Sequence, residues 1–380
     1  MSMSDLFLDK NPPKLVILDG GNGTTLTDEM GMTLDPELWS SSLLVHHPEL
    51  IVRLHTDWEK AGAQIVESCS YQATLKGFEN FLSKTAHRQH DLNESNELSK
   101  NPVDFQPRSA LDYLRSSVTL ARSSLTTAKL GLSLGPFGAT LTPPQDYAGI
   151  YPSPHHQFEP LKKFHLERLL NYTTDESTWR QVDLVIFETL PNLMEIRAIR
   201  AAWSALTDAL KEQYGRQEGP QWWIKPWVLS FVFAGPTGQF ASGASPINVL
   251  EAALGTNDTL DIGILPRPSG VGINCTKLAF VSDIVAAWTD SPQSQCLRNL
   301  GVSSPWLWIY PDGGLVYDVE TRSWAGGQIG TEEWARQVMG IAKRAQLTWP
   351  GVVVGGCCKT GPAHIRALKS MLQSSPENTC

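Results

Sequence analysis

The sequence predicts an α/β fold, a (β/α)8 TIM barrel. Eight short apolar segments, each long enough for one strand, alternate with amphipathic segments whose apolar residues recur every three or four positions. The interiors of the short segments are almost entirely apolar, which is typical of parallel strands covered on both faces. These observations favour a barrel of parallel strands inside a ring of helices. Periodicity alone does not show closure, so an open doubly wound sheet remains the alternative.

The eight expected strands lie, in chain order, at 14–18, 64–69, 130–134, 183–187, 227–233, 270–274, 306–310 and 351–354. The spacing of apolar residues predicts helices over 48–62, 111–125, 192–206, 280–288, 332–345 and 363–372. Pro48, Pro191 and Pro362 stand where three of these helices should begin, a position that suits proline because its missing N–H is not needed there.

Two polar stretches interrupt this alternation. Residues 83–107 lack any periodicity and are expected to form a polar surface loop inserted into the fold, and 211–221 resembles a smaller insertion. The alternation of strand and helix resumes directly after each stretch, so neither reads as a domain linker. The chain, residues 1–380, is therefore expected to form a single barrel domain.

Composition excludes several classes of partner. Charged residues make up 18% of the 380 residues and the net charge is −8, whereas a nucleic-acid-binding protein needs a basic face. No apolar run approaches the ~18 residues of a membrane span, and the first residues lack the apolar core of a signal peptide. We expect a soluble cytoplasmic protein that acts on small molecules, with its oligomeric state left open.

Polar residues follow three of the expected strands. Asp19 lies in the glycine-rich turn after the first strand, where Leu26 breaks the G-x-G-x-x-G dinucleotide fingerprint. Ser70 follows the second strand, and Glu188 comes directly after the apolar run of the fourth. A carboxylate at that position is costly unless it is exposed at the barrel mouth or paired, which favours a functional role for Glu188. For Asp19 and Ser70, an ordinary role as turn residues explains their positions equally well.

Three cysteines give a sharper signal. Six cysteines are too sparse for a disulfide scaffold, so reduced thiols are expected. Cys275 ends the sixth strand, and Cys357 and Cys358 follow two glycines at the end of the eighth. Because the carboxyl ends of barrel strands open on one face, three thiolates could converge on one ion there. Zn²⁺ favours thiolate ligands, and three protein ligands leave a fourth position for a reactant. Without the other two cysteines, Cys275 would be interpreted as a small buried residue of the core.

An ordered set of motifs extends this interpretation to a family. The chain contains, in this order, ILDGGNGTTL, SYQAT, GPFGATL, FETLPNLMEIRAI, GINC, YPDGG and GGCCKTGPAHIRAL. From about Leu15 to Leu372 it resembles the homocysteine S-methyltransferases. The resemblance implies a (β/α)8 barrel, a zinc ion, and transfer of a methyl group to the thiol of L-homocysteine to form L-methionine.

The resemblance also implies roles for single residues. Matched by motif, the zinc ligands are Cys275, Cys357 and Cys358, the residues that hold the substrate's amino group are Asp19 and Glu188, and the nearby hydroxyl is Ser70. The chain departs from the usual pattern in having TGP where TTP is more common and YPDGG where an asparagine often follows the proline. The 83–107 insertion has no counterpart in shorter members. These departures do not touch the implied ligands.

The methyl donor is the remaining question. The SYQA and GPFGA motifs resemble those of members that use S-methyl-L-methionine, with S-adenosyl-L-methionine as an alternative donor. Zinc would deprotonate the acceptor thiol, which is mostly protonated at neutral pH, and no general base is then required in the methyl transfer. A betaine-type methyltransferase and a non-catalytic zinc- or thiol-binding barrel are the competing hypotheses. A selenium-containing acceptor also stays open.

Overall fold

A computed structural model describes residues 2–7, 13–93, 108–215, 221–255, 263–290, 304–314, 316–318, 323–325 and 329–374, with backbone alone at 87–93, 316–318 and 323–325. Eight parallel strands form one sheet whose hydrogen-bonded order is β1-β10-β7-β6-β5-β4-β3-β2. Their bounds are β1 Leu15–Ile17, β2 Ile65–Glu67, β3 Lys129–Leu134, β4 Leu184–Leu190, β5 Trp227–Phe231, β6 Gly270–Asn274, β7 Trp306–Tyr310 and β10 Val352–Val354.

The sheet closes between its first and last strands. Leu18 and Ile65 form a parallel bridge, and on either side of it the Asp19 N–H donates to the Ile65 carbonyl at 3.1 Å and the Gln64 N–H to the Ile17 carbonyl at 2.7 Å. The fold is therefore a (β/α)8 barrel, which confirms the predicted class. Each of the eight expected strands is present, and only their ends differ by a few residues.

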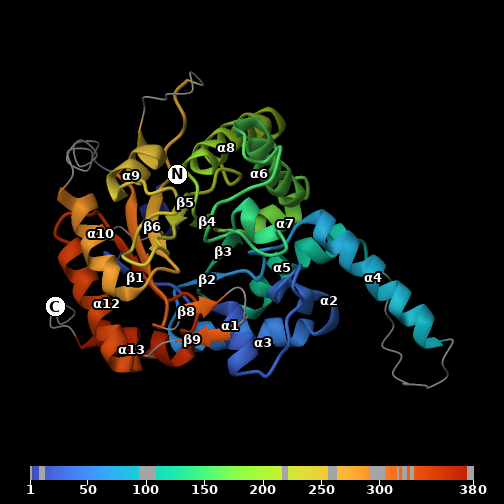
Figure 1. The fold of residues 1–380 in the computed structure, drawn as a ribbon, viewed down its shortest axis with the longest axis horizontal. Helices are drawn as coiled ribbons and strands as arrows, with labels where there is room; N and C mark the ends of the chain where they lie inside the picture. The colour runs from blue at the N-terminus through green and yellow to red at the C-terminus, as the bar shows by residue number, and fades with distance from the viewer. Residues whose placement is uncertain are drawn as a thin grey trace.

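Helices follow the strands and surround the barrel (Figure 1). The helices after successive strands are α3 Pro48–Ala61, α5 Ala110–Ser124, α6 Phe158–Thr173 with α7 Glu176–Gln181, α8 Leu193–Tyr214, α9 Pro246–Leu254, α10 Leu278–Asp290, α12 Thr331–Ala345 and α13 Pro362–Gln373. Shorter or additional elements are η1 Met3–Phe7, α1 Asn22–Asp28, η2 Ser40–Ser42, α2 Leu43–His46, α4 Leu75–Asn93, η3 Phe137–Thr140 and the antiparallel pair β8 Val316–Asp318 and β9 Ser323–Ala325.

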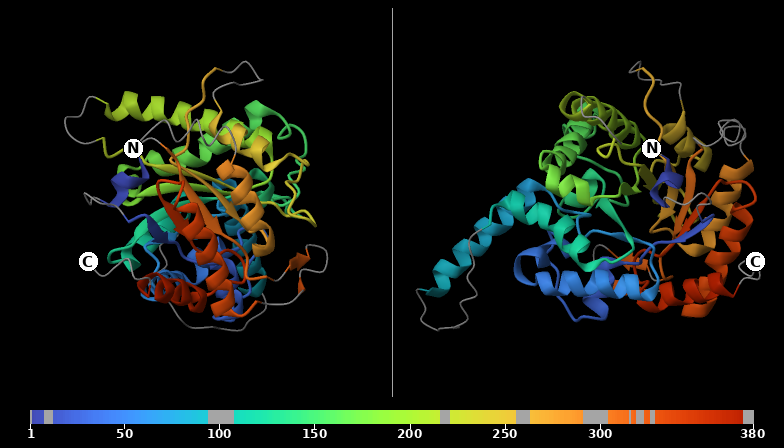
Figure 2. Two further views of the ribbon diagram at one scale, coloured as in Figure 1. Left: turned by 90° about the vertical axis from the view of Figure 1, so that its left-hand side faces the viewer. Right: turned by 180° about the vertical axis from the view of Figure 1, so that it is seen from behind.

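The expected loop at 83–107 is wrong in its first part. Helix α4 continues through residue 93 and projects away from the barrel (Figures 1 and 2), and residues 94–107 lie outside the described part of the chain. A helix that leaves the core has no apolar face to bury, so its sequence loses the periodicity on which the prediction depended. Similarly, α8 extends to Tyr214 within the smaller stretch at 211–221, of which 216–220 are not described.

Local signals explain several helix boundaries. Pro48 and Pro362 occupy the first turns of α3 and α13, as expected, whereas Pro191 precedes the cap residue of α8. The Asn192 side chain accepts hydrogen bonds from the first N–H groups of α8 and so fixes its start. At the other end of α3, Gly62 adopts φ 114°, a left-handed conformation that ends the helix and that glycine tolerates best.

Two apolar layers hold the barrel together. The inner layer fills the barrel with side chains from the strands and from η1, where Phe7 stacks on Trp306 at the start of β7. The outer layer packs the strands against the surrounding helices. Because side chains fill the interior, the mouth, where the strands end, is the expected ligand site of such a barrel. Within the described residues, no helix has the length and apolar character needed to cross a lipid bilayer.

Candidate functional site

The three predicted cysteines meet at the mouth of the barrel. Cys275 follows β6, and Cys357 and Cys358 follow β10, with β7 between these strands in the sheet. Their sulfur atoms all lie within 4.8 Å of one another, in the one group of potential metal ligands among the described residues. Three thiolates about 2.3 Å from a tetrahedral zinc lie about 3.8 Å apart, so three reduced sulfurs gathered this closely could share one such ion.

The structure corrects the expectation that all thiols are reduced. Cys275 and Cys357 form a disulfide, while Cys358 and Cys69 are free. The physical reason is the convergence itself, because the Cα atoms of the two residues lie 5.4 Å apart, within the range that a disulfide spans. A disulfide sulfur carries no thiolate charge, so metal binding by all three residues requires this bond to be reduced first.

The glycines before Cys357 allow close packing of the β10 loop. A Cβ at Gly355 would collide with the Asp19 carbonyl, and one at Gly356 with the Thr360 side chain. The Cys357 N–H donates to the Pro311 carbonyl at 2.9 Å, which ties the loop to the end of β7. The two glycines thus let the cysteine pair approach the neighbouring strand ends.

Asn274, next to Cys275, organises the other side of the cluster. Its Oδ1 accepts from the Thr189 N–H at 2.9 Å and the Ser230 hydroxyl at 2.8 Å, and its Nδ2 donates to Thr189 Oγ1 at 2.7 Å. Cys275 and Thr189 both have positive φ, 47° and 58°, an uncommon conformation for residues with side chains. The buried amide joins β4, β5 and β6 and holds these two strained residues in place.

We expect Asn274→Ala to lower the free energy of unfolding by about 2–3 kcal/mol, because it leaves buried donors and acceptors on Thr189 and Ser230 without partners. Urea denaturation of the reduced chain measures this change. Asn80→Ala, on the exposed surface of α4, is the control and should stay within about 0.5 kcal/mol of the wild type. An Asn274 variant as stable as this control would contradict the organising role.

The surroundings of Cys358 keep its thiol protonated unless a cation binds. Burial, and then the nearby Asp312 carboxylate, raise the pKa of Cys358 to about 12, and the Tyr147 hydroxyl opposes this rise. Thr189 Oγ1 lies 4.0 Å from Cys275 Sγ, and Asn274 Nδ2 lies 4.0 Å from Cys357 Sγ. Once the disulfide is reduced, these sulfurs have only such long hydrogen-bond contacts, which leaves their lone pairs available to a soft metal ion.

Both predicted carboxylates lie buried at the same mouth. Asp19 Oδ2 accepts from the Glu67 N–H at 2.8 Å, and Glu188 Oε1 accepts from the Ser133 hydroxyl. Burial raises the pKa of Glu188 to about 7. Burial also raises the pKa of Asp19 well above its usual range, with a smaller contribution from the Glu188 carboxylate. Two buried acids that are destabilised when charged form a natural site for a cation.

Sequence reasoning missed a third acid in this group. Glu67 ends β2, is 5% exposed, and interacts electrostatically with both Glu188 and Asp19. Burial, followed by these two carboxylates, raises the pKa of Glu67 well above its usual range. The signal was present, because Glu67 interrupts an apolar segment as Glu188 does; Glu188 itself lies inside β4 and not after it as expected. The expected strand at 64–69 ran two residues too far and placed Glu67 inside the strand instead of at its end.

Within the described part of the chain, no hydrogen bond joins Ser70 to the carboxylates. Its hydroxyl donates to the Ser133 carbonyl at 2.8 Å and lies 2.6 Å from the Ser68 hydroxyl. Its own carbonyl accepts from Arg168 at 3.2 Å. These contacts link the end of β2 to β3, so the Ser70 hydroxyl is already engaged within the fold.

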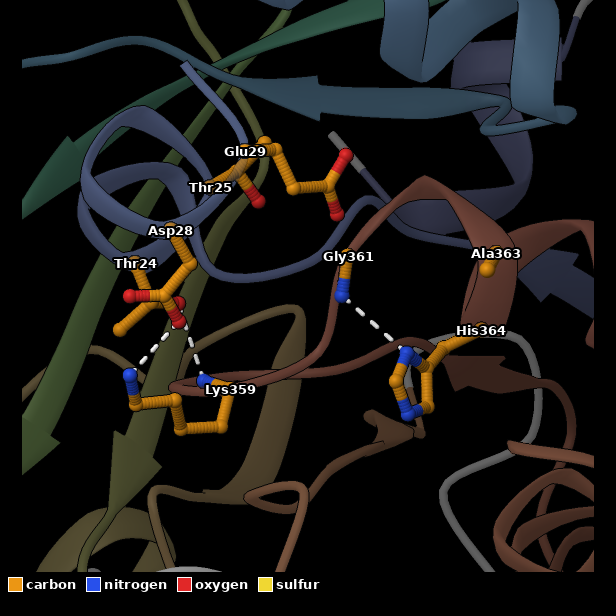
Figure 3. Close-up of a pocket in the computed structure, with 8 residues that line it drawn as sticks. All are labelled: Thr24, Thr25, Asp28, Glu29, Lys359, Gly361, Ala363 and His364. Atoms are coloured by element: carbon orange, nitrogen blue, oxygen red, sulfur yellow. Dashed lines mark hydrogen bonds and ion pairs between the residues drawn. The ribbon is translucent and has the colours of Figure 1, made fainter. Parts of the chain in front are cut away.

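A separate pocket lies beside the cysteine loop, between α1 and the start of α13 (Figure 3). It is lined by Thr24, Thr25, Asp28, Glu29, Lys359, Gly361, Ala363 and His364. The Lys359 ammonium reaches Asp28 Oδ2 at 2.6 Å, and the Gly361 N–H donates to His364 Nδ1 at 3.2 Å. None of the predicted site residues lines this pocket, so it is distinct from the barrel mouth.

Comparisons with known proteins agree with the geometry. Residues 16–372 match the family described as homocysteine S-methyltransferase. Homocysteine S-methyltransferase 4 of Zea mays is 30% identical over 354 residues, covering 93% of this chain and 87% of the relative. Selenocysteine Se-methyltransferase of Brassica oleracea var. italica is 29% identical over 379 residues, covering 98% and 92%.

Solved structures of one enzyme share the fold. The metallated form of the homocysteine methyltransferase MmuM from Escherichia coli aligns with a TM-score of 0.61 at 26% identity, covering 96% of this chain and 98% of that one. The oxidized form of the same enzyme aligns with the same TM-score and identity, covering 97% and 98%.

Proposed function

Because the chain belongs to the homocysteine S-methyltransferase family, we propose that it methylates the thiol of L-homocysteine with a sulfonium donor and forms L-methionine. The donor is S-methyl-L-methionine or S-adenosyl-L-methionine, and the chain acts as one barrel domain. The observation that carries the proposal is the meeting of three cysteine sulfurs at the barrel mouth. In this proposal Cys275, Cys357 and Cys358 hold a zinc ion.

Different residues are proposed to bind the two ends of the substrate, its thiol and its ammonium group. Bound zinc would supply the positive charge that keeps the homocysteine thiol deprotonated at neutral pH. Asn274 and Thr189 hold Cys275 in its orientation, and Asp19 and Glu188 bind the substrate's ammonium group. The Ser70 hydroxyl donates to the Ser133 carbonyl, and its oxygen can still accept a hydrogen bond from the substrate, so Ser70 keeps its proposed place near the ammonium group.

The transfer itself needs no further proton acceptor. A lone pair of the homocysteine sulfur forms the new S–CH₃ bond while the donor's S–CH₃ bond breaks, and the bonding electrons stay on the donor sulfur. The sulfonium thereby becomes a neutral thioether. An acidic mouth favours the positively charged donor over a neutral one, and the buried carboxylates provide that environment.

The proposal is tested by methionine formation from homocysteine with S-methylmethionine, S-adenosylmethionine and betaine in parallel. The chain is reduced beforehand, since the Cys275–Cys357 disulfide blocks two of the three ligands, and each assay is run with and without zinc. Zinc-dependent turnover with a sulfonium donor supports the proposal. Turnover with betaine but with neither sulfonium compound would show that the donor is of the betaine type. Binding of metal and homocysteine without any turnover would indicate a non-catalytic barrel.

A selenium-containing acceptor is the second candidate. It is favoured by the likeness to the Brassica relative, whose name is selenocysteine Se-methyltransferase. Zinc binds soft ligands of this kind, and a selenolate is a softer ligand than a thiolate. Competition between homocysteine and selenocysteine for the same donor measures the preference directly.

Substrate affinity should depend on pH through Glu188, whose pKa burial raises to about 7. Below that pH its carboxylate is protonated and cannot pair with an ammonium, so KM for homocysteine should rise about tenfold between pH 8 and pH 6. The control acceptor is 4-mercaptobutanoate, which has the thiol but no ammonium and whose KM reports thiol ionisation alone. Equal pH dependence for both acceptors would contradict this role of Glu188.

A further inference from the structure

Three buried polar atoms at the barrel mouth have no hydrogen-bond partner within the described part of the chain. They are Asp19 Oδ1, Glu67 Oε1 and the Tyr310 hydroxyl. The three residues are 0%, 5% and 1% exposed, respectively. Buried polar groups in folded proteins are nearly always paired, so three such atoms in one place point to a polar ligand.

The three atoms belong to one group at the strand ends. Asp19 follows β1, Glu67 ends β2 and Tyr310 ends β7. The Tyr310 hydroxyl interacts electrostatically with the carboxylates of Glu188, Glu67 and Asp19. Ser230 also lies near it, but the Ser230 hydroxyl donates to Asn274 Oδ1. By hydrogen-bond geometry the Tyr310 hydroxyl has no partner within the described residues, and it lies close to the acidic group.

The main chain of Glu67 is held on both sides. Its N–H donates to Asp19 Oδ2 at 2.8 Å, and its carbonyl lies 3.2 Å from His55 Nε2 and accepts from Asn22 Nδ2 at 3.2 Å. The backbone is thus fixed by three contacts while the side-chain oxygen is uncommitted. The fold therefore positions this carboxylate, although the free oxygen makes no hydrogen bond that stabilises the fold.

We propose that Glu67 is a third carboxylate that receives the substrate's ammonium group, together with Asp19 and Glu188. The inference rests on the proposed function and narrows its acceptor to thiols that carry a primary ammonium. A primary ammonium has three N–H donors, and the three carboxylates supply one acceptor each. It also brings a positive charge to three acids that are buried together.

Replacing Glu67 tests this assignment. In the reduced, zinc-loaded chain, Glu67→Gln keeps the shape of the side chain and removes its charge. We expect kcat/KM for homocysteine to fall at least tenfold, mainly through KM, while kcat/KM for 4-mercaptobutanoate stays within twofold. Glu29→Gln, in the separate surface pocket, is the matched control and should leave both values unchanged. An equal loss for the two acceptors, or no loss, would overturn the proposal.

Binding measurements separate this inference from the reaction. Calorimetry with zinc-loaded wild-type chain should give at least tenfold weaker binding for N,N-dimethylhomocysteine, which keeps the charge but has one N–H, than for homocysteine. Equal affinities would overturn the three-acceptor site. The comparison needs no variant to fold and no turnover. If wild-type protein binds in this order but transfers no methyl group from any donor, the proposed function fails while the ammonium site stands.

Discussion

Replacing Cys275, Cys357 or Cys358 by serine is expected to lower the zinc content of the reduced chain and to reduce methyl transfer by more than about 100-fold, because even the outer-shell partners of a metal ligand are worth about 10–100-fold. Each variant removes one of three sulfur donors that lie within 4.8 Å of one another. Serine does not ionise at neutral pH, so it cannot supply the anionic ligand that the site requires. Zinc content is measured by atomic emission on the purified variants, and activity by methionine formation.

The control for this series is Cys69→Ser. Cys69 is also a free, buried cysteine, and burial raises its pKa, but it lies outside the cluster. The Ser40 side chain lies close enough to pair with the new hydroxyl. This variant should keep its zinc and its activity to within a few-fold. Wild-type activity in any one of the three cluster variants would exclude a three-cysteine site.

Glu188→Gln should raise KM for homocysteine by about 10- to 100-fold, because a hydrogen bond to a charged partner contributes about 1.5–3 kcal/mol. The effect on kcat should be small, since Glu188 is proposed to bind the ammonium and not the reacting sulfur. Steady-state kinetics with saturating S-methylmethionine measures both values. An unchanged KM for homocysteine would show that Glu188 does not contact the amino acid.

The same variant should be more stable than the wild type at high pH in the absence of substrate. The pKa of Glu188 is raised from 4.5 to about 7 in the folded chain, so its charged form costs stability as the pH rises through this window. A shift of this size corresponds to about 3 kcal/mol at most at pH 8, and to no difference below about pH 4. This gain in stability with loss of binding is typical of a functional site.

The strand ends were predictable because two independent patterns meet there. Unbroken apolar runs mark parallel strands, and the polar residue after each run marks the barrel mouth. From the sequence alone, this rule places on one face of the barrel Asp19, Glu188 and the three cysteines. The distances between these side chains could not be predicted. They depend on the φ of Cys275 and on the Asn274 amide, which are set by contacts between β4, β5 and β6.

Other features required the structure. Glu67 belongs to the site only because β2 ends two residues earlier than its apolar pattern suggests. Ser70 follows β2 as predicted, but the hydrogen bond that orients its hydroxyl goes to a carbonyl of the neighbouring strand β3. Residues 83–93 lie in the part of α4 that projects away from the barrel, so no apolar stripe in the sequence identifies them. In each case the deciding contact comes from a neighbouring element or is missing altogether, and local sequence does not encode it.

X-ray absorption at the zinc edge of the reduced, zinc-loaded chain tests the central claim most directly. Without substrate, we predict three sulfur ligands at about 2.3 Å and one lighter ligand. Addition of homocysteine should replace the lighter ligand by a fourth sulfur, and Cys357→Ser should remove one sulfur from the count. A spectrum that homocysteine leaves unchanged would contradict thiol activation at a three-cysteine zinc site.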